Sequence, residues 1–166
     1  KKLHQLSEKL LFFSVPCDLK GSAKMLEQPA NAIYMKRFLR ELHEKIRAKM
    51  SIMPHLINDE GYEKIKNFKQ FDDRYTAPIH GFRDAEDYWY QCSSRRFLKY
   101  IQVPTLIVNA LNDPFLSPSC YPVKEVKKNS NVVLEIPKDG GHVGFVEFNE
   151  ASIYWSEKVA VKWFSY

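Results

Sequence analysis

The fold class of this chain is decided by one stretch of its sequence, Pro104-Thr105-Leu106-Ile107-Val108-Asn109-Ala110-Leu111-Asn112-Asp113-Pro114-Phe115. The run from Thr105 to Asn109 is almost continuously apolar, which is typical of a strand buried on both faces of a parallel sheet. Asp113 lies in the turn that follows, and the catalytic groups of open α/β sheets collect at the carboxyl ends of their strands. The stretch also suits a simple turn, because Asn, Asp and Pro all favour turns.

Two other short runs have the character of strands, residues 10–15 and residues 131–136, each followed by a proline. The run at 10–15 is also nearly continuous in apolar residues, so we expect it too to be buried on both faces. Apolar spacing and capping residues predict helices at 31–50, 59–68, 84–92, 97–100 and 151–164. Strands that alternate with helices predict an α/β fold with about three parallel strands. The roughly 90 residues between the first two strands far exceed one crossover. We therefore expect a helical insertion at about 20–100.

Two of the expected helices carry a clear apolar stripe. In the helix at 31–50, for which Asn31 is a plausible N-cap, Met35, Leu39, Leu42 and Ile46 recur at steps of three and four. In the last helix, Trp155, Val159 and Trp163 are spaced four apart. We expect this second stripe to pack on the sheet, with a membrane or partner face as the less favoured alternative.

A second segment with chemical potential runs from Glu135 to Phe145 and contains Gly140-Gly141-His142. The two glycines permit a tight turn that presents one histidine, and histidine is the usual general base near neutral pH. A histidine taken alone is more often a surface or core residue. Here, however, His142 follows Asp113 by 29 residues, and each comes just after a strand. This is the order of acid and base in an α/β-hydrolase triad.

Taken together, these segments resemble the YheT-like branch of the α/β-hydrolases. The resemblance rests on Asn-Ala-x-x-Asp-Pro-Phe at 109–115 and Gly-Gly-His-Val-Gly-Phe at 140–145. It extends to Asp-Asp-Arg-Tyr-Thr-Ala-Pro at 72–78 and to Ser-Val-Pro-Cys-Asp-Leu at 14–19. It covers residues 10–164 and implies that residues 1–166 form the C-terminal half of one hydrolase domain with a helical cap.

The resemblance implies a carboxylic-ester hydrolase of the EC 3.1.1 type that uses the serine mechanism, with Asp113 as triad acid and His142 as base. Where the family often has two acidic residues before Pro-Phe, this chain has Asn112-Asp113. The family's Gly-x-Ser-x-Gly elbow does not occur in the sequence. We therefore expect the chain alone to be inactive. No cofactor or metal is expected.

Other readings of the reactive residues are weaker. Asp72, Asp73, His80 and Asp84 could suggest a metal site, but adjacent carboxylates usually point apart and Asp72 equally suits a helix N-cap. Cys17 could pair with His142 as a nucleophile, but Pro-Cys-Asp forms no elbow. Four serines are interpreted as structural or capping residues: Ser14, Ser22, Ser93 and Ser94.

Composition bounds the function further. The chain is 45% hydrophobic and 14% aromatic, which excludes a disordered segment. Its net charge of +5 is not gathered in one patch, so a solvated basic surface is favoured over a nucleic-acid-binding face. Three widely spaced cysteines, no apolar run near 20 residues and no signal peptide favour a cytoplasmic protein without a transmembrane segment. The chain does not begin with Met, which suggests an excised piece.

The expected partners follow from this reading. They are a small ester or lipid-like substrate, and either the missing N-terminal half or a second copy that pairs with the exposed edge of residues 10–15. The alternative function is a non-catalytic fragment that binds a ligand or a partner protein.

Overall fold

The computed structural model describes residues 8–148 and 152–165. The chain divides into two compact units. The first takes in both ends of the chain, up to Asp18 and from Ser94 onward, and the second runs from Leu19 to Ser93.

The first unit contains a parallel sheet, in the order β1 (Leu10–Phe13), β2 (Thr105–Val108) and β3 (Val132–Glu135). The α/β fold with about three parallel strands is therefore confirmed. The last residues of the three strands are paired with one another: Phe13 of β1 lies opposite Val108 of β2, and Val108 lies opposite Glu135 of β3. All three strands thus end at one edge of the sheet, where the loops after them meet.

Each strand is shorter than its apolar run. β1 ends because Ser14 takes a left-handed backbone angle, φ 54°. β2 is buried throughout, as predicted, but the same prediction for β1 is wrong, since Phe12 is 45% exposed. Within the described residues β1 hydrogen-bonds to β2 alone, so one side of this strand has no neighbour.

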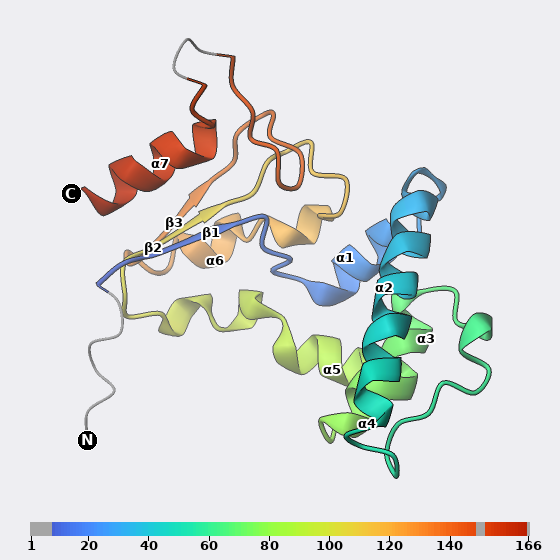
Figure 1. Ribbon diagram of the computed structural model, residues 1–166. Coiled ribbons are helices and arrows are strands. Elements are labelled where there is room, and N and C mark those ends of the chain that lie inside the picture. The colour runs from blue at the N-terminus through green and yellow to red at the C-terminus, as the bar shows by residue number, and fades with distance from the viewer. Residues whose placement is uncertain (1–7, 149–151, 166) are drawn as a thin grey trace. The chain divides into compact units, whose positions relative to one another are not determined.

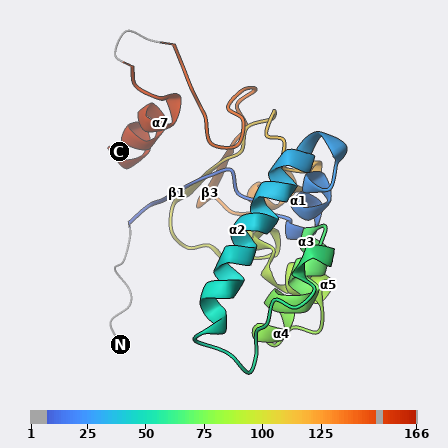
Figure 2. The ribbon, with the colours of Figure 1, turned by 45° about the vertical axis from the view of Figure 1, so that its right-hand side comes forward.

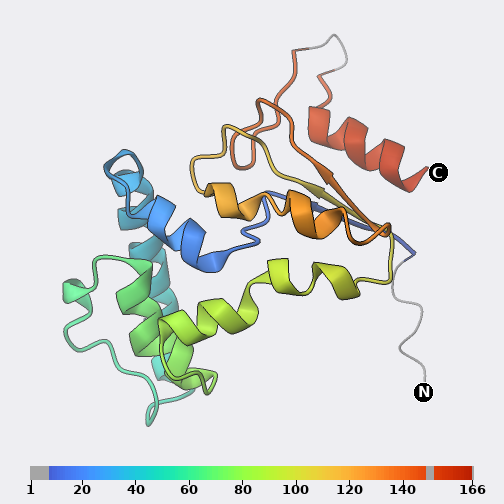
Figure 3. The same ribbon diagram turned by 180° about the vertical axis from the view of Figure 1, so that it is seen from behind.

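Both faces of the sheet carry helices (Figures 1 and 3). Leu106 and Val108 point to the face covered by α7 (Trp155–Phe164), and Ile107 points to the face covered by η5 (Leu98–Tyr100) and α6 (Val123–Val126). The short helical turns η4 (Ser94–Arg96) and η6 (Pro118–Cys120) complete the unit.

The stripe on α7 packs on the sheet as predicted, since Trp155, Val159 and Trp163 contact the cluster that contains Leu106. The helix itself begins later than expected. Residue 151 of the predicted helix lies outside the described residues, and residues 152–154 are not helical. Tyr154 is the N-cap of α7, and its backbone N–H donates to the Glu157 carboxylate, which fixes the start of the helix at Trp155.

The second unit is helical. In chain order it contains α1 (Leu19–Leu26), η1 (Pro29–Asn31), α2 (Ala32–Met50), η2 (Tyr62–Lys64), α3 (Phe68–Phe71), η3 (Asp72–Thr76), α4 (Ala77–Ile79) and α5 (Ala85–Cys92). Its two ends are adjacent, because the Leu19 backbone N–H donates to Ser93 Oγ over 3.1 Å. Among the described residues, no helix combines the length and the apolar character that crossing a bilayer requires.

The core of this unit lies along α2 and takes in residues of α3 and α4, which lie beside α2 in Figure 2. The predicted stripe is confirmed for Met35, Leu39 and Ile46, which are buried, whereas Leu42 is partly buried at the margin of the same cluster. Asn31 occupies the N-cap position of α2, as predicted, but its side chain does not act as the cap. Asn31 makes no side-chain capping bond to α2 and instead donates to the Met25 carbonyl.

The helix predicted at 59–68 is also wrong. Gly61 has φ 67°, which interrupts a helix, and Asp59 accepts hydrogen bonds from His43 and Arg47 on α2. This segment is therefore a loop tied to α2, with one short turn at η2. Asn67 then caps α3 by accepting from the Gln70 backbone N–H over 2.9 Å. The helix α1 was not expected from the sequence.

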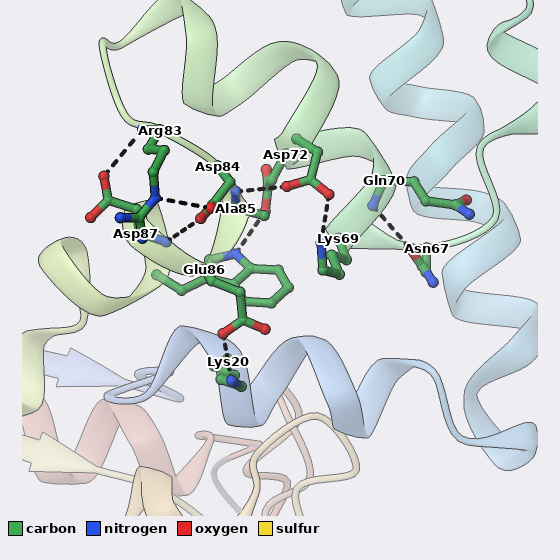
Figure 4. Close-up of polar contacts among 12 residues, drawn as sticks. Lys20, Asn67, Lys69, Gln70, Asp72, Arg83, Asp84, Ala85, Glu86 and Asp87 are labelled. Atoms are coloured by element: carbon green, nitrogen blue, oxygen red, sulfur yellow. Dashed lines mark hydrogen bonds and ion pairs between the residues drawn. The ribbon is translucent and has the colours of Figure 1, made fainter.

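A network of carboxylates joins the shorter helices (Figure 4). Asp72 is buried and accepts from Trp89 Nε1 at 2.8 Å and from Thr76 Oγ1 at 2.6 Å. Asp73 accepts from the Ala85 backbone N–H and from Lys69 Nζ, while Asp84 caps α5. Each carboxylate of this cluster is therefore engaged in holding helices together.

The Asp72 carboxyl gives this unit a pH-dependent stability. Burial raises the pKa of Asp72, and the hydrogen bonds from Thr76 and Trp89 offset that rise only in part. The folded chain therefore holds this proton more tightly than the unfolded chain does. The stability that the unit gains from this tighter proton binding is fully present below the ordinary Asp pKa of about 3.9. It is lost as pH rises through the raised pKa of Asp72.

We expect Asp72→Asn to gain stability relative to the parent chain as pH rises, because the amide mimics the neutral acid. Its oxygen can accept from Trp89 and its NH2 can donate to the Thr76 hydroxyl. Urea unfolding of both chains between about pH 4 and pH 7.5, followed at the Trp89 indole N–H by NMR, measures the difference. A difference that stays constant over this range would contradict the assignment.

Candidate active site

The structure brings Asp113 and His142 into contact. Asp113 lies in the loop after β2 and His142 in the loop after β3, and His142 Nδ1 is 2.9 Å from Asp113 Oδ2. Both loops leave the same edge of the sheet because the strands are parallel and in register. The two residues singled out in the sequence thus form one hydrogen-bonded pair.

Asp113 is held rigidly. Its side chain is fully buried, and its second oxygen, Oδ1, accepts from the Phe115 backbone N–H over 2.9 Å. The Asp113 backbone N–H in turn donates to the Ala110 carbonyl. A carboxylate with both oxygens engaged cannot rotate freely, so it fixes the imidazole plane.

The His142 ring is partly exposed, and its second nitrogen, Nε2, is not engaged by the Asp113 contact. Its side chain is 35% exposed, and its ring lies 4.7 Å from the Phe115 ring, centroid to centroid. Nε2 makes no hydrogen bond to any of the described residues. The imidazole is therefore oriented through Nδ1 and open at Nε2, which is the arrangement that a general base requires.

The loop that carries His142 depends on two glycines and one phenylalanine. Gly141 has φ 60°, in the region that glycine favours. A Cβ on Gly140 would lie 2.7 Å from the Phe145 ring and 2.9 Å from the Ala110 Cβ. Phe145 donates its backbone N–H to the Gly140 carbonyl over 2.8 Å. The Gly-Gly pair therefore allows the loop to close over Phe145, with His142 at its tip.

Asn109 joins the loops at the edge of the sheet that carries Asp113 and His142. It is fully buried at the end of β2, where its Oδ1 accepts from the Val15 backbone N–H and its Nδ2 donates to the Val15 and Cys120 carbonyls. Tyr121 donates its hydroxyl to the Ala110 carbonyl over 2.6 Å. Burial, together with the nearby carboxylate of Asp113, raises the pKa of Tyr121. These supports were not found from the sequence, although a polar Asn closing an apolar run was the available signal.

The competing candidates do not gather into a second site. Cys17 is fully buried, and burial raises the pKa of its thiol to about 11, which keeps it protonated near neutral pH. Asp72, Asp73 and Asp84 are engaged in the helix contacts described above, and His80 is exposed in the turn after α4. Within residues 8–148 and 152–165, no group of three His, Cys, Asp or Glu side chains could hold a metal ion.

The four candidate serines each lie in a different setting. Ser22 is buried in α1, and Ser93 donates to the Trp89 carbonyl at the end of α5. The Ser94 hydroxyl is buried beside the Cys17 thiol and opposes the rise in the pKa of that thiol. Ser14 lies close to His142 but donates its hydroxyl to the His142 backbone carbonyl, not to the imidazole.

Proteins from several organisms are similar to this chain in sequence. No protein-family model matches the chain, and no solved structure does. The chain is 32% identical to the mouse (Mus musculus) protein named phospholipase ABHD3 over 136 residues, covering 81% of this chain and 33% of that protein. It is 33% identical to Escherichia coli YheT, whose name proposes an esterase, over 80% of this chain and 39% of YheT.

A third relative is the Saccharomyces cerevisiae protein named medium-chain fatty acid ethyl ester synthase/esterase 2. It is 32% identical over 114 residues, which are 67% of this chain and 25% of the yeast protein. The chain thus spans between a quarter and two fifths of the length of these relatives. The parallel sheet, its helices and these relatives agree on one assignment. The chain belongs to the YheT-like α/β-hydrolases.

Proposed function

We propose that this chain supplies the acid, Asp113, and the base, His142, of the catalytic triad of a carboxylic-ester hydrolase. The observation that carries the proposal is the 2.9 Å contact between His142 Nδ1 and the buried Asp113 carboxylate. The nucleophile is a serine outside this sequence, which contains no Gly-x-Ser-x-Gly. The chain alone is therefore inactive.

In this mechanism His142 Nε2 removes the proton from the serine hydroxyl as the serine oxygen attacks the ester carbonyl. Asp113 accepts a hydrogen bond from Nδ1 throughout and stabilises the imidazolium that forms. The imidazolium then gives its proton to the departing alcohol, which leaves an acyl-serine. Water, deprotonated by Nε2, attacks the acyl group and releases the carboxylic acid and the free serine.

The proposed substrates are esters with an apolar acyl chain. The names of the relatives are a phospholipase, an esterase and a fatty acid ethyl ester synthase/esterase, and all three names describe chemistry at a carboxylic ester. The helical unit from Leu19 to Ser93 interrupts the chain between β1 and β2 and has a core of its own. We assign the role of the cap to this unit.

The proposed partner is the segment that carries the serine, and its docking site is the free edge of β1. A parallel strand added there would end beside Ser14, whose hydroxyl already contacts the His142 backbone. A nucleophile following that strand would thus come near Nε2. A second copy of the chain could occupy the same edge when the serine segment is absent, since unpaired strand edges recruit other strands.

The test combines this chain with the segment that precedes it, in one polypeptide or as two, and measures hydrolysis of short-chain p-nitrophenyl esters. Activity that requires a serine in a Gly-x-Ser-x-Gly turn, and that a fluorophosphonate blocks, supports the proposal. A well-folded assembly with intact Asp113 and His142 but no serine-dependent turnover refutes it. Fatty acid binding without turnover would instead support the alternative of a binding fragment.

A further inference from the structure

The backbone on either side of the His142 ring is held by two side chains from neighbouring loops. Ser14, at the end of β1, donates its hydroxyl to the His142 carbonyl. Asn112, in the loop after β2, accepts from the Gly141 backbone N–H over 2.8 Å. The loop after β3 is thus fastened to the ends of both other strands, next to the residue that it presents.

Ser14 is an unusual residue for this position. It is 8% exposed, and its own N–H continues the β ladder by donating to the Val108 carbonyl over 2.8 Å. Its φ of 54° lies in the left-handed region, which costs a residue with a Cβ about 1–2 kcal/mol. The turn aims the hydroxyl across the end of β2 to the His142 carbonyl. Strain of this kind persists where the surrounding structure over-determines it, which often occurs at functional sites.

Asn112 uses both ends of its amide. Its Oδ1 accepts from Gly141, and its Nδ2 donates to Asp139 Oδ1 over 3.3 Å. Asn112 thereby joins the loop after β2 to the turn that precedes His142. Because it directly precedes Asp113, the same short loop holds both the imidazole and the backbone from which the imidazole projects.

We propose that Ser14 and Asn112 are positioning residues, which hold the His142 backbone so that Nδ1 stays on Asp113 and Nε2 stays aimed at the nucleophile. This inference rests on the proposed function and extends it to two residues outside the triad. The reason is geometric. The side chain of His142 is 35% exposed, so packing alone leaves its ring free to turn. Two backbone anchors and one carboxylate restrict it.

The variants Ser14→Ala and Asn112→Ala each remove one anchor. In the assembled enzyme we expect kcat to fall about 10-fold with KM within about 2-fold, because misplacement of a base slows proton transfer without altering substrate binding. In ¹⁵N-histidine NMR spectra of the same protein, the His142 Nδ1 proton should exchange with water about 10-fold faster, since exchange needs the Nδ1 bond to open.

Two further variants separate positioning from folding. Ser14→Gly also lacks the hydroxyl but relieves the left-handed strain, so it should be more stable than Ser14→Ala and lose the same activity. Asn112→Asp combined with Asp139→Asn keeps the acceptor for Gly141 and preserves a donor and an acceptor between the two side chains, so it should retain most of kcat, a rescue that a simple loss of loop packing does not predict. Ser165→Ala and Asn131→Ala remove side-chain bonds to backbone elsewhere in the same unit and serve as controls.

The proposal is overturned if Ser14→Ala, Ser14→Gly and Asn112→Ala match these controls in both kcat and Nδ1 proton exchange. Equal loss in the swapped pair Asn112→Asp/Asp139→Asn and in Asn112→Ala would also overturn the role assigned to the Gly141 contact. If the assembled protein proves not to hydrolyse esters, the exchange measurement still decides whether the two side chains fix the imidazole. Failure of the inference is thus distinguishable from failure of the proposed function.

Discussion

Replacing Asp113 by Asn in the assembled hydrolase lowers kcat about 10⁴-fold. The Asn amide is expected to donate its NH2 to Nδ1, which forces the proton onto Nε2, where the base must be unprotonated. Water cannot replace the lost carboxylate, because the Asp113 side chain is fully buried. His142→Gln removes the base itself and should cost at least as much.

These variants are measured as kcat and KM for a short-chain p-nitrophenyl ester. The double variant should be no slower than His142→Gln, because residues that act as one unit are not additive. The control is His80→Gln, an exposed histidine in the turn after α4, which should retain full activity. An Asp113→Asn protein within 10-fold of the parent would rule out Asp113 as the triad acid.

The second large effect concerns stability. Phe145→Ala should destabilise the sheet-bearing unit by about 3–5 kcal/mol. Phe145 is 3% exposed and lies between Phe13, at 5.2 Å edge to face, and Trp155, stacked at 5.7 Å. Its removal leaves a cavity where β1, β2 and α7 meet. The close approach of Gly140 and Ala110 to its ring means that the cavity cannot collapse without moving the His142 loop.

Urea denaturation, followed by the fluorescence of the tryptophans on α7, measures this loss. The matched control is Phe148→Ala, three residues further along the chain, whose side chain is fully exposed; it should change the free energy of unfolding by less than about 0.5 kcal/mol. Similar values for the two variants would show that Phe145 is not the anchor of the loop. We also expect Phe145→Ala to impair catalysis, since the Gly140-Gly141 turn that precedes His142 packs on the Phe145 ring.

The sequence predicts those parts of the fold in which one local pattern determines one structure. β2 could be placed because an almost continuously apolar run between Pro104 and a turn favours a buried strand. α5 could be placed because Asp84 is a capping residue before a helical run, and it does accept from the Asp87 backbone N–H. The order of Asp113 and His142 predicted a pair because parallel strands bring their exit loops to one edge.

The remaining features depend on contacts between distant segments, which local patterns do not encode. The segment at 59–68 has helix-compatible residues, but Asp59 is drawn to His43 and Arg47 on α2. The role of Ser14 depends on a residue 128 positions away, and a lone serine after a strand gives no sign of it. Phe12 is exposed because β1 lies at the edge of the sheet among the described residues. The apolar composition of residues 10–15 does not distinguish an edge strand from a central one.

The adjacency of Leu19 and Ser93 bears on how this chain folds. Pairing β1 with β2 joins residues such as Leu10 and Thr105, which would ordinarily require the closure of a very long and slow loop. If the helical unit folds first on its own local contacts, its joined ends make it equivalent to a short connection. By the logarithmic law for loop closure, this lowers the entropic barrier to sheet formation by about 1–1.5 kcal/mol. An inserted unit of this design can lengthen or diverge through evolution without slowing the assembly of the sheet edge that carries Asp113 and His142.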